Sequence, residues 1–220
     1  MDVTQVLLVD DDAMVRTGLR MVLSADPALR VVAEATNGRQ AVAMVREMAP
    51  DVVLMDLQMP VLDGIAATRE LRASGYSNPV LVLTTFQLDT YVVEALRAGA
   101  NGYLLKDTAP EEIIRGVHVA AAGDSVFSAA ITQRLVATIG QSDSAATADA
   151  RDRLARLTER EREVAEAVAA GSSNAAIAAD LHMSEATVKS HVSRIFAKTA
   201  AENRVQIALL VYQVGPYPGQ

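Results

Sequence analysis

The chain has 220 residues, half of them hydrophobic, and contains no cysteine, which excludes disulfide bonds and thiolate metal sites. Its length suits one large or two small domains with substantial hydrophobic cores. No apolar run reaches the roughly 20 residues needed to cross a bilayer, and no signal-peptide pattern opens the sequence, so we expect a cytoplasmic protein with no membrane partner.

The net charge of −7 is unevenly distributed along the chain. Residues 1–124 carry 17 acidic and 10 basic side chains, a net charge of −7, whereas residues 125–220 carry 10 of each. Within the second part, residues 186–204 hold four basic residues and one acidic residue, a net charge of +3. An acidic part followed by a part with a local basic patch indicates different binding partners for the two.

Short apolar runs alternate with amphipathic segments through the first part of the chain. The apolar runs lack the alternation of half-exposed strands, so they predict strands buried on both faces, as in a parallel sheet. The predicted strands lie at 6–9, 30–33, 52–55, 79–83 and 103–105, and a helix follows each, the last three near 64–73, 89–98 and 110–122. We therefore expect an α/β fold with a doubly wound five-stranded parallel sheet, flavodoxin-like in type.

Polar residues follow four of these strands at the point where each leaves the sheet. Asp10 and Asp11 follow the first strand, Asp56 the third, Thr84 the fourth and Lys106 the fifth. The carboxyl ends of parallel strands form the edge at which ligands bind. If the strand order is 2-1-3-4-5, the first and third strands are neighbours, and the three carboxylates converge.

Converging carboxylates need a cation, because two of them ~4 Å apart repel each other by about 4 kcal/mol at an effective dielectric constant of about 20. A set of oxygen ligands suits Mg²⁺. An aspartate neutralised in this way, beside a lysine and a hydroxyl, can attack a phosphoryl group and hold its oxygens. Taken singly, Asp56 also fits a turn former or helix cap, Lys106 a solvated charge and Tyr103 a core aromatic.

Residues 1–124 resemble the receiver domain of two-component response regulators. The motifs that carry the resemblance are Asp10-Asp11, Asp56 with Met59-Pro60, Asp63-Gly64, Thr84, and Tyr103 with Lys106. The resemblance implies that Asp56 is the phosphoacceptor, that a sensor histidine kinase is the partner and that Mg²⁺ is the cofactor. The implied metal ligands are Asp11, Asp56 and the backbone carbonyl of Gln58, with Asp10 acting through water. Thr84 and Lys106 would contact the phosphoryl group, and Tyr103 would change rotamer on activation.

Residues 125–153 are predicted to link two domains. A helical pattern near 128–139 carries apolar residues at helical spacing. The following residues, 140–153, are small and polar and show no apolar periodicity. We therefore expect a flexible linker there.

The rest of the chain predicts an all-α domain of short helices. Thr158 and Glu161 form a capping box that opens a helix ending near Ala170. A second helix is predicted over 174–181, and a tight turn separates it from a third over 184–198. This layout is that of a helix-turn-helix, whose last helix enters a DNA groove.

The third of these helices has one apolar and one polar face. Val188, Val192, Ile195 and Thr199 share a stripe that should face the core. Short side chains between cations allow close approach to a DNA groove, although a solvated basic face looks the same in sequence. The candidate DNA contacts are Thr187, Lys189, Ser190, Ser193, Arg194 and Lys198.

Residues 154–214 resemble the LuxR-type helix-turn-helix domain, through the motifs LTEREREV at 157–164 and SEATVKSHV at 184–192. With a receiver domain in front, the chain is similar to the NarL/FixJ subfamily of response regulators. The resemblance implies a DNA-binding transcriptional regulator, not an enzyme, that receives a phosphoryl group from the kinase and binds promoter DNA as a homodimer. The third helix would read the major groove, and a fourth, near 203–214, would pair two DNA-binding domains.

Two positions depart from these families. Asp107 stands where proline usually follows the lysine of the wider receiver family, which leaves the isomer of that peptide bond open. Thr199-Ala200 stands where leucine followed by glycine or another residue is usual, which leaves the packing at the end of the third helix open. The tail, 215–220, is expected to be unstructured.

Two other functions are compatible with parts of the sequence. A phosphohydrolase of the haloacid dehalogenase type would use Asp10 and Asp12 as nucleophile and acid, but the pattern asks for a further acidic pair, and only Asp124 is found, with Ser128 at the other position. The second alternative is a DNA-binding regulator that works without phosphorylation. A phosphorylation assay distinguishes it from the main hypothesis.

Overall fold

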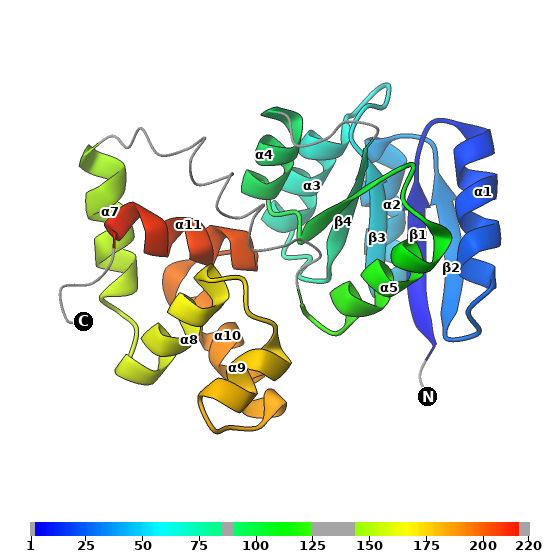
Figure 1. The fold of residues 1–220 in the computed structure, drawn as a ribbon. Helices are drawn as coiled ribbons and strands as arrows, with labels where there is room; N and C mark the ends of the chain where they lie inside the picture. The colour runs from blue at the N-terminus through cyan, green and yellow to red at the C-terminus, as the bar shows by residue number, and fades with distance from the viewer. Residues whose placement is uncertain (1–2, 85–89, 125–143, 216–220) are drawn as a thin grey trace. The chain divides into compact units, whose positions relative to one another are not determined.

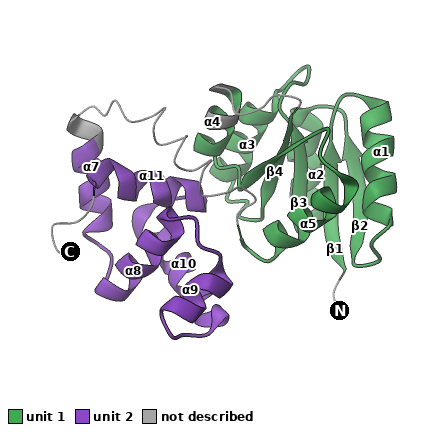
Figure 2. Ribbon diagram, in the orientation of Figure 1, with its two compact units in different colours: residues 1–126 green, residues 127–220 purple. Residues whose placement is uncertain are grey.

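The computed structural model describes residues 3–84, 90–124 and 144–215 (Figure 1). The chain divides into two compact units, residues 1–126 and 127–220 (Figure 2). Each unit has its own hydrophobic core. Among the described residues, no helix combines the length and the apolar character that passage through a bilayer requires.

The first unit is built on a parallel sheet with helices on both faces. Its strands are β1 (Thr4–Val9), β2 (Leu29–Ala35), β3 (Val52–Asp56), β4 (Val80–Thr84) and β5 (Gly102–Leu105), and its helices are α1 (Ala13–Ser24), α2 (Gly38–Met48), α3 (Gly64–Ala73), α4 (Thr90–Arg97) and α5 (Pro110–Ala121). Neighbouring strands pair in parallel in the order β2-β1-β3-β4-β5. The predicted doubly wound five-stranded fold is therefore confirmed.

Successive residues of the central strands point to opposite faces of the sheet. Leu8 and Leu54 pack against residues of α1 and α5 on one face, whereas Leu7 and Val53 pack against residues of α2 and α3 on the other (Figure 1). Because both faces are covered, β3, β4 and the buried part of β1 need apolar residues at successive positions, whereas the edge strand β2 also holds Arg30 and Glu34. This explains why the strands appear in the sequence as continuous apolar runs.

Three helices of this unit are capped at their first turn by a polar side chain from the loop that follows a strand. Asp12, Asn37 and Asp63 cap α1, α2 and α3, and each side chain accepts a hydrogen bond from a backbone N–H of the first helical turn. These bonds satisfy donors that a helix leaves without partners. They also fix the direction in which the chain leaves the carboxyl edge of the sheet.

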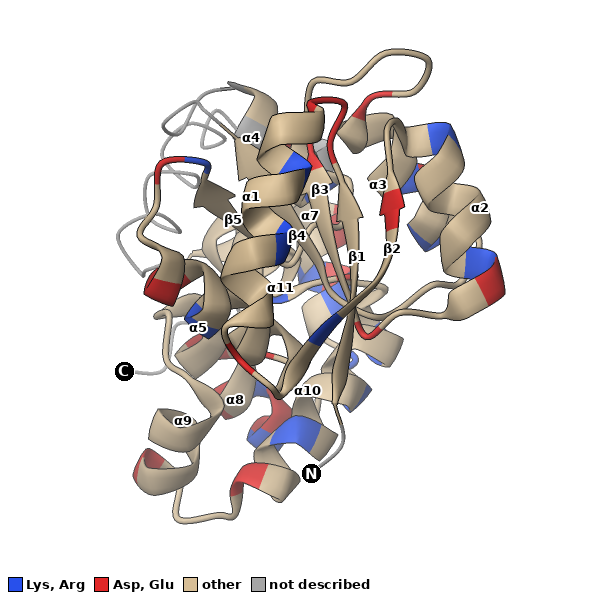
Figure 3. Ribbon diagram, turned by 90° about the vertical axis from the view of Figure 1, so that its right-hand side faces the viewer, with Lys and Arg blue, Asp and Glu red and all other residues tan. Residues whose placement is uncertain are grey.

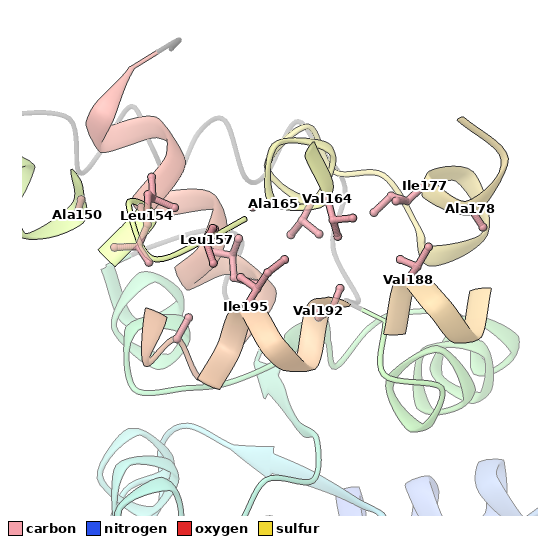
Figure 4. Packing of buried hydrophobic residues seen from close by; sticks show 14 residues of the cluster. Ala150, Leu154, Leu157, Val164, Ala165, Ile177, Ala178, Val188, Val192 and Ile195 are labelled. Carbon is pink, nitrogen blue, oxygen red and sulfur yellow. The ribbon is translucent and has the colours of Figure 1, made fainter. Parts of the chain in front are cut away.

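The described residues of the second unit form helices joined by loops. Its helices are α7 (Ser144–Leu154), α8 (Glu159–Ala169), α9 (Asn174–Asp180), α10 (Glu185–Thr199) and α11 (Arg204–Val214). Every one of them contributes a buried residue to one core (Figure 4). The predicted helix-turn-helix corresponds to α9 and α10, and His182 in the turn has the left-handed φ of 53°. The capping box of Thr158 and Glu161 is present as predicted.

The prediction of a flexible linker near 140–153 was wrong for most of that range. Residues 144–154 form α7, in which Ala150 and Leu154 are 0% and 2% exposed and belong to the core of the second unit. Alanines favour helix, and two apolar residues four positions apart are enough to dock one short helix. The helix predicted near 128–139 lies outside the described residues.

Candidate functional site

The turn that follows β1 holds its three aspartates in different ways. Asp10 is completely buried, and one of its carboxylate oxygens accepts the N–H of Asp12 at 2.9 Å. The Asp12 carboxylate caps α1 by accepting the N–H of Met14 at 2.7 Å. Asp11 lies between them with an exposed side chain. Two aspartates therefore have structural bonds, and the middle one faces solvent at the sheet edge.

Asp56 is the last residue of β3 and lies beside this turn. It is 5% exposed. The strand order makes β1 and β3 neighbours, and carboxylate oxygens of Asp10, Asp11 and Asp56 lie within 4.8 Å of one another. The convergence expected from the strand order is thus present. All three groups offer oxygen ligands, which is the chemistry that Mg²⁺ prefers.

Lys106, just after β5, supplies a positive charge to this cluster. Its Nζ lies 2.7 Å from an oxygen of Asp10 and 3.1 Å from an oxygen of Asp56. Burial raises the pKa of the Asp56 carboxyl, and Lys106 only partly opposes this effect. Burial alone would lower the pKa of Lys106, but its bonds to Asp10 and the charge of Asp56 outweigh burial and raise it. The cluster holds three carboxylates and one ammonium, which pairs with Asp10 and Asp56, so it retains an excess of negative charge.

Thr84 and Tyr103 lie on the strands next to Asp56. Asp56 pairs in register with Leu83, so Thr84 follows at the end of β4, where it is 3% exposed. The backbone carbonyl of Thr84 accepts the N–H of Lys106 at 2.8 Å. Tyr103 is half-buried on β5. The peptide bonds of the described residues are all trans. The bond between Lys106 and Asp107, whose isomer the sequence left open, is therefore trans.

The loop between β3 and α3 shapes the entrance to the cluster. The N–H of Gly64 bonds to the carbonyl of Leu57 at 3.0 Å, and a Cβ on Gly64 would lie 2.0 Å from the carbonyl oxygen of Asp56. Only glycine allows this approach, which gives the Asp63-Gly64 pair a physical reason. Gln58 is exposed in the same loop and lines an open groove of about 510 Å³ together with Asp11, Asp63, Arg69 and Tyr91.

The candidate DNA-binding face lies on α10 of the second unit. The stripe of Val188, Val192, Ile195 and Thr199 is buried, as predicted. The residues that face solvent include Thr187, Lys189, Ser190, Ser193 and Arg194. Ser184 caps the helix by accepting the N–H of Thr187 at 3.1 Å. Five of the six candidate contacts are therefore exposed on one helix.

Lys198, the sixth candidate, contacts the interior of its own unit. Its Nζ lies 2.6 Å from the carboxylate of Glu161, a residue that is only 3% exposed. The same Glu161 oxygen accepts the N–H of Thr158 in the capping box at 2.8 Å. Lys198 thus ties the end of α10 to the start of α8. Its sequence position on the flank of the polar face did not distinguish this contact from a phosphate contact.

A buried arginine in the second unit was also not predicted from the sequence. Arg204, at the start of α11, is 7% exposed and donates to Asn174 Oδ1 at 2.7 Å and to the carbonyl of Ser172 at 2.6 Å. These bonds connect α11 to the start of α9. The available signal was a lone arginine at the head of a strongly apolar helix, which is weak evidence by itself.

The departure at Thr199-Ala200 has a local solution in this fold. Thr199 is completely buried, and its hydroxyl donates to the carbonyl of Ile195 at 2.7 Å. Ala200 ends the helix with a left-handed φ of 55°, a conformation that glycine adopts more easily. The threonine hydroxyl is therefore satisfied, and alanine carries the conformational cost.

Comparison with known proteins matches two families to this chain. The family described as "Response regulator receiver domain" matches residues 6–118, and the family described as "Bacterial regulatory proteins, luxR family" matches residues 155–211. The nitrate/nitrite response regulator protein NarL of Escherichia coli is 38% identical over 208 residues, which cover 94% of each chain. The response regulator protein VraR of Staphylococcus aureus is 37% identical over 216 residues, or 95% of this chain and 96% of VraR.

Solved structures give the same result. The response regulator ChrA of a heme-sensing two-component system is 33% identical with a TM-score of 0.53, covering 97% of this chain and 98% of ChrA. The receiver domain of a putative response regulator NarL from Mycobacterium tuberculosis is 32% identical with a TM-score of 0.54, covering 56% of this chain and 99% of that domain.

Proposed function

The chain belongs to the two-component response regulators that carry a LuxR-type DNA-binding domain, and on this premise we propose that Asp56 accepts a phosphoryl group that controls DNA binding by α10. As a member of this family it is a DNA-binding transcriptional regulator. The observation that carries the proposal is the cluster of Asp10, Asp11 and Asp56 around one lysine at the carboxyl edge of the sheet.

The residues of this cluster fit a divalent cation. Three carboxylates and one ammonium leave two negative charges in excess, and every donor is an oxygen. Asp11, Asp56 and the Gln58 carbonyl would hold Mg²⁺ directly, and Asp10 through water. The bound ion would neutralise the carboxylates and attract phosphoryl oxygens.

Asp56 then acts as the nucleophile. Its carboxylate oxygen attacks the phosphorus of a phosphohistidine on the partner kinase, the P–N bond breaks as the P–O bond forms, and the imidazole leaves. Lys106 pairs with Asp56 and would pair with the phosphoryl oxygens after the transfer. The Thr84 hydroxyl would donate a hydrogen bond to them from the neighbouring strand.

We expect acetyl phosphate with Mg²⁺ to phosphorylate the wild-type protein on Asp56. Asp56→Asn keeps the shape of the side chain but removes the nucleophile, so the adduct of one phosphoryl group should be absent from its mass spectrum. An adduct of unchanged yield on Asp56→Asn would refute the assignment. An exposed carboxylate on α2 provides the control, and Glu47→Gln should still be phosphorylated.

DNA contact is assigned to the exposed residues of α10. Lys189 is proposed to contact a base edge, with Thr187, Ser190 and Ser193 beside it and Arg194 on a phosphate. Lys198 is instead assigned to support of α10, because its ammonium is engaged with Glu161.

Lys189→Ala should weaken binding to a promoter site about tenfold, since a good base contact contributes roughly 1–3 kcal/mol of discrimination. Arg194→Ala should reduce the salt dependence of binding by about one phosphate equivalent. Fluorescence anisotropy across a salt series measures both. Equal affinity of wild type and Lys189→Ala, with the domain folded, would show that this face is only solvated.

Control of DNA binding is proposed to pass through dimerisation. A phosphoryl group on Asp56 would draw Thr84 inward and let Tyr103 turn toward the space it leaves, which would alter the surface near α4 and β5. A coupling of about 1–3 kcal/mol corresponds to a 5- to 150-fold gain in DNA affinity. Sedimentation with and without beryllofluoride and Mg²⁺ tests this step. An identical oligomeric state and affinity in both would favour the regulator that works without phosphorylation.

The phosphohydrolase alternative is not supported. The relatives that match nearly the whole chain are named as response regulators, and they share the DNA-binding unit that a phosphohydrolase does not need. Asp12, which that alternative uses as the catalytic acid, caps α1 with its carboxylate.

A further inference from the structure

An arginine of α1 contacts the backbone of the acidic turn. Arg16 donates from Nη1 to the carbonyl oxygen of Asp10 at 2.7 Å, and its side chain is only 13% exposed. Its Nε lies 3.3 Å from one carboxylate oxygen of Glu34 on β2. The other Glu34 oxygen lies 2.7 Å from Arg20, whose side chain is 53% exposed. Figure 3 colours the basic residues of α1 blue and the acidic residue of β2 red.

The contact completes the fixation of Asp10. Its N–H bonds to the carbonyl of Ala35 at 3.1 Å, and its carboxylate accepts the N–H of Asp12. The carbonyl held by Arg16 belongs to the same planar peptide unit as the N–H of Asp11. A guanidinium on that oxygen therefore fixes the direction in which the chain enters Asp11, the exposed member of the cluster.

The charge of Arg16 would by itself oppose a cation in the cluster. Glu34 offsets part of it, because its carboxylate faces the guanidinium from β2 and pairs with Arg20 as well. The arginine can then orient the turn through a charge-assisted hydrogen bond while reducing the excess of negative charge less than an unpaired cation would. Arg20 shares Glu34 but contacts no group of the cluster in the described interactions.

We propose that Arg16 is a positioning residue for the metal site and that Glu34 is its charge partner. This inference rests on the proposed Mg²⁺ site of the cluster. Residues that hold metal ligands in place typically change metal affinity 10- to 100-fold when they are removed. A purely structural contact would change the stability of the fold and leave the affinity for Mg²⁺ unchanged.

Two double variants separate position from charge. Arg16→Gln/Glu34→Gln removes the bond to Asp10, and Arg20→Gln/Glu34→Gln keeps it, while both preserve the net charge of the full chain. Isothermal titration with Mg²⁺ at fixed ionic strength gives the affinity. We expect the Arg16 double variant to bind Mg²⁺ about tenfold more weakly or worse, and the Arg20 double variant to stay within about threefold of wild type.

A second measurement does not depend on the metal. In metal-free protein, amide hydrogen exchange of Asp11 and Asp12 should accelerate in the Arg16 double variant and not in the Arg20 double variant. If neither double variant changes exchange or affinity relative to wild type, Arg16 does not position the turn, and the inference is wrong. Accelerated exchange combined with no Mg²⁺ binding in wild type would support the positioning and refute the proposed metal site instead.

Arg16→Lys guards against a failure to fold. It keeps the cation but loses the planar fork that reaches both the Asp10 carbonyl and Glu34. We expect a melting temperature near that of wild type and a loss of Mg²⁺ affinity between those of the two double variants. Wild-type affinity and wild-type exchange in this variant would overturn the role of the guanidinium.

Discussion

Both units bury charged side chains, but the balance of charge differs between them. In the first unit the buried Asp10 and Asp56 both pair with Lys106, and the exposed Asp11 lies in the same cluster. In the second unit Glu161 has its own lysine, and Arg204 has an amide and a carbonyl as acceptors. The first arrangement keeps an excess of negative charge, whereas the charges of the second have partners within the fold.

This difference is the one expected between residues that bind a ligand and residues that stabilise the fold. A buried group without enough partners costs free energy, and such a cost persists where a ligand repays it. A buried charge with partners costs little while intact but leaves the partner unsatisfied when it is removed. The comparison therefore predicts opposite signs for the removal of charge. In the second unit removal should destabilise the fold, and in the metal-free first unit it should stabilise it.

The largest effect is expected for Arg204→Met. The substitution keeps much of the buried volume but leaves Asn174 Oδ1 and the Ser172 carbonyl without this donor, which should destabilise the second unit by about 3 kcal/mol. Urea unfolding measures the change. Arg194→Met, at an exposed position on α10, is the matched control and should change stability by less than about 0.5 kcal/mol. Equal effects of the two would show that burial of Arg204 is unimportant.

The next pair tests the opposite signs directly. Glu161→Gln loses the pair with Lys198 and weakens the capping box, so we expect a loss of about 2 kcal/mol. Asp56→Asn relieves repulsion within the cluster and should stabilise the metal-free first unit by about 1 kcal/mol. Calorimetry in the presence of a chelator measures both. Destabilisation by both substitutions would contradict the comparison.

The two carboxylates should also respond oppositely to acid. Burial raises the pKa of Asp56 above the ordinary value of 3.8, so its protonation stabilises the fold below that value, and this stability is lost as pH rises through the higher folded pKa. Burial alone would raise the pKa of Glu161, but Lys198 and Thr158 lower it below the ordinary value of 4.5. Its stabilisation is present above that value and is lost as pH falls through the folded pKa. Comparing each variant with wild type from pH 7 down to about pH 2 covers both transitions and isolates the two contributions.

The first unit could be predicted well because its site follows from topology. Once apolar runs define parallel strands, the residues after the strands must meet at one edge, so Asp56 and Lys106 are brought together whatever the loops do. The backbone contacts that hold the site could not be found in this way. The bond from Arg16 to the Asp10 carbonyl depends on a side-chain rotamer, and no spacing rule specifies it.

The second unit was harder to predict because helical side chains have a choice of direction. Periodicity assigned the buried stripe of α10, but a lysine at the edge of the stripe can reach solvent or fold inward, and Lys198 folds inward to Glu161. The small residues of α7 gave little periodic signal, although Leu154 is buried in the core. Patterns thus identified the elements, whereas the partners of single charges required the structure.

The smallest predicted effect concerns the backbone conformation at the end of α10 in the second unit. Ala200 ends α10 with φ of 55°, where a Cβ is unfavourable, so Ala200→Gly should stabilise the unit by about 0.5 kcal/mol. Ala197→Gly makes the same chemical change on the exposed face of the same helix and should cost about 1 kcal/mol. Urea unfolding of the two variants gives the comparison. If both glycines destabilise, the gain in entropy of the unfolded chain exceeds the strain at Ala200, and the threonine-alanine end of α10 is as well adapted as a glycine end.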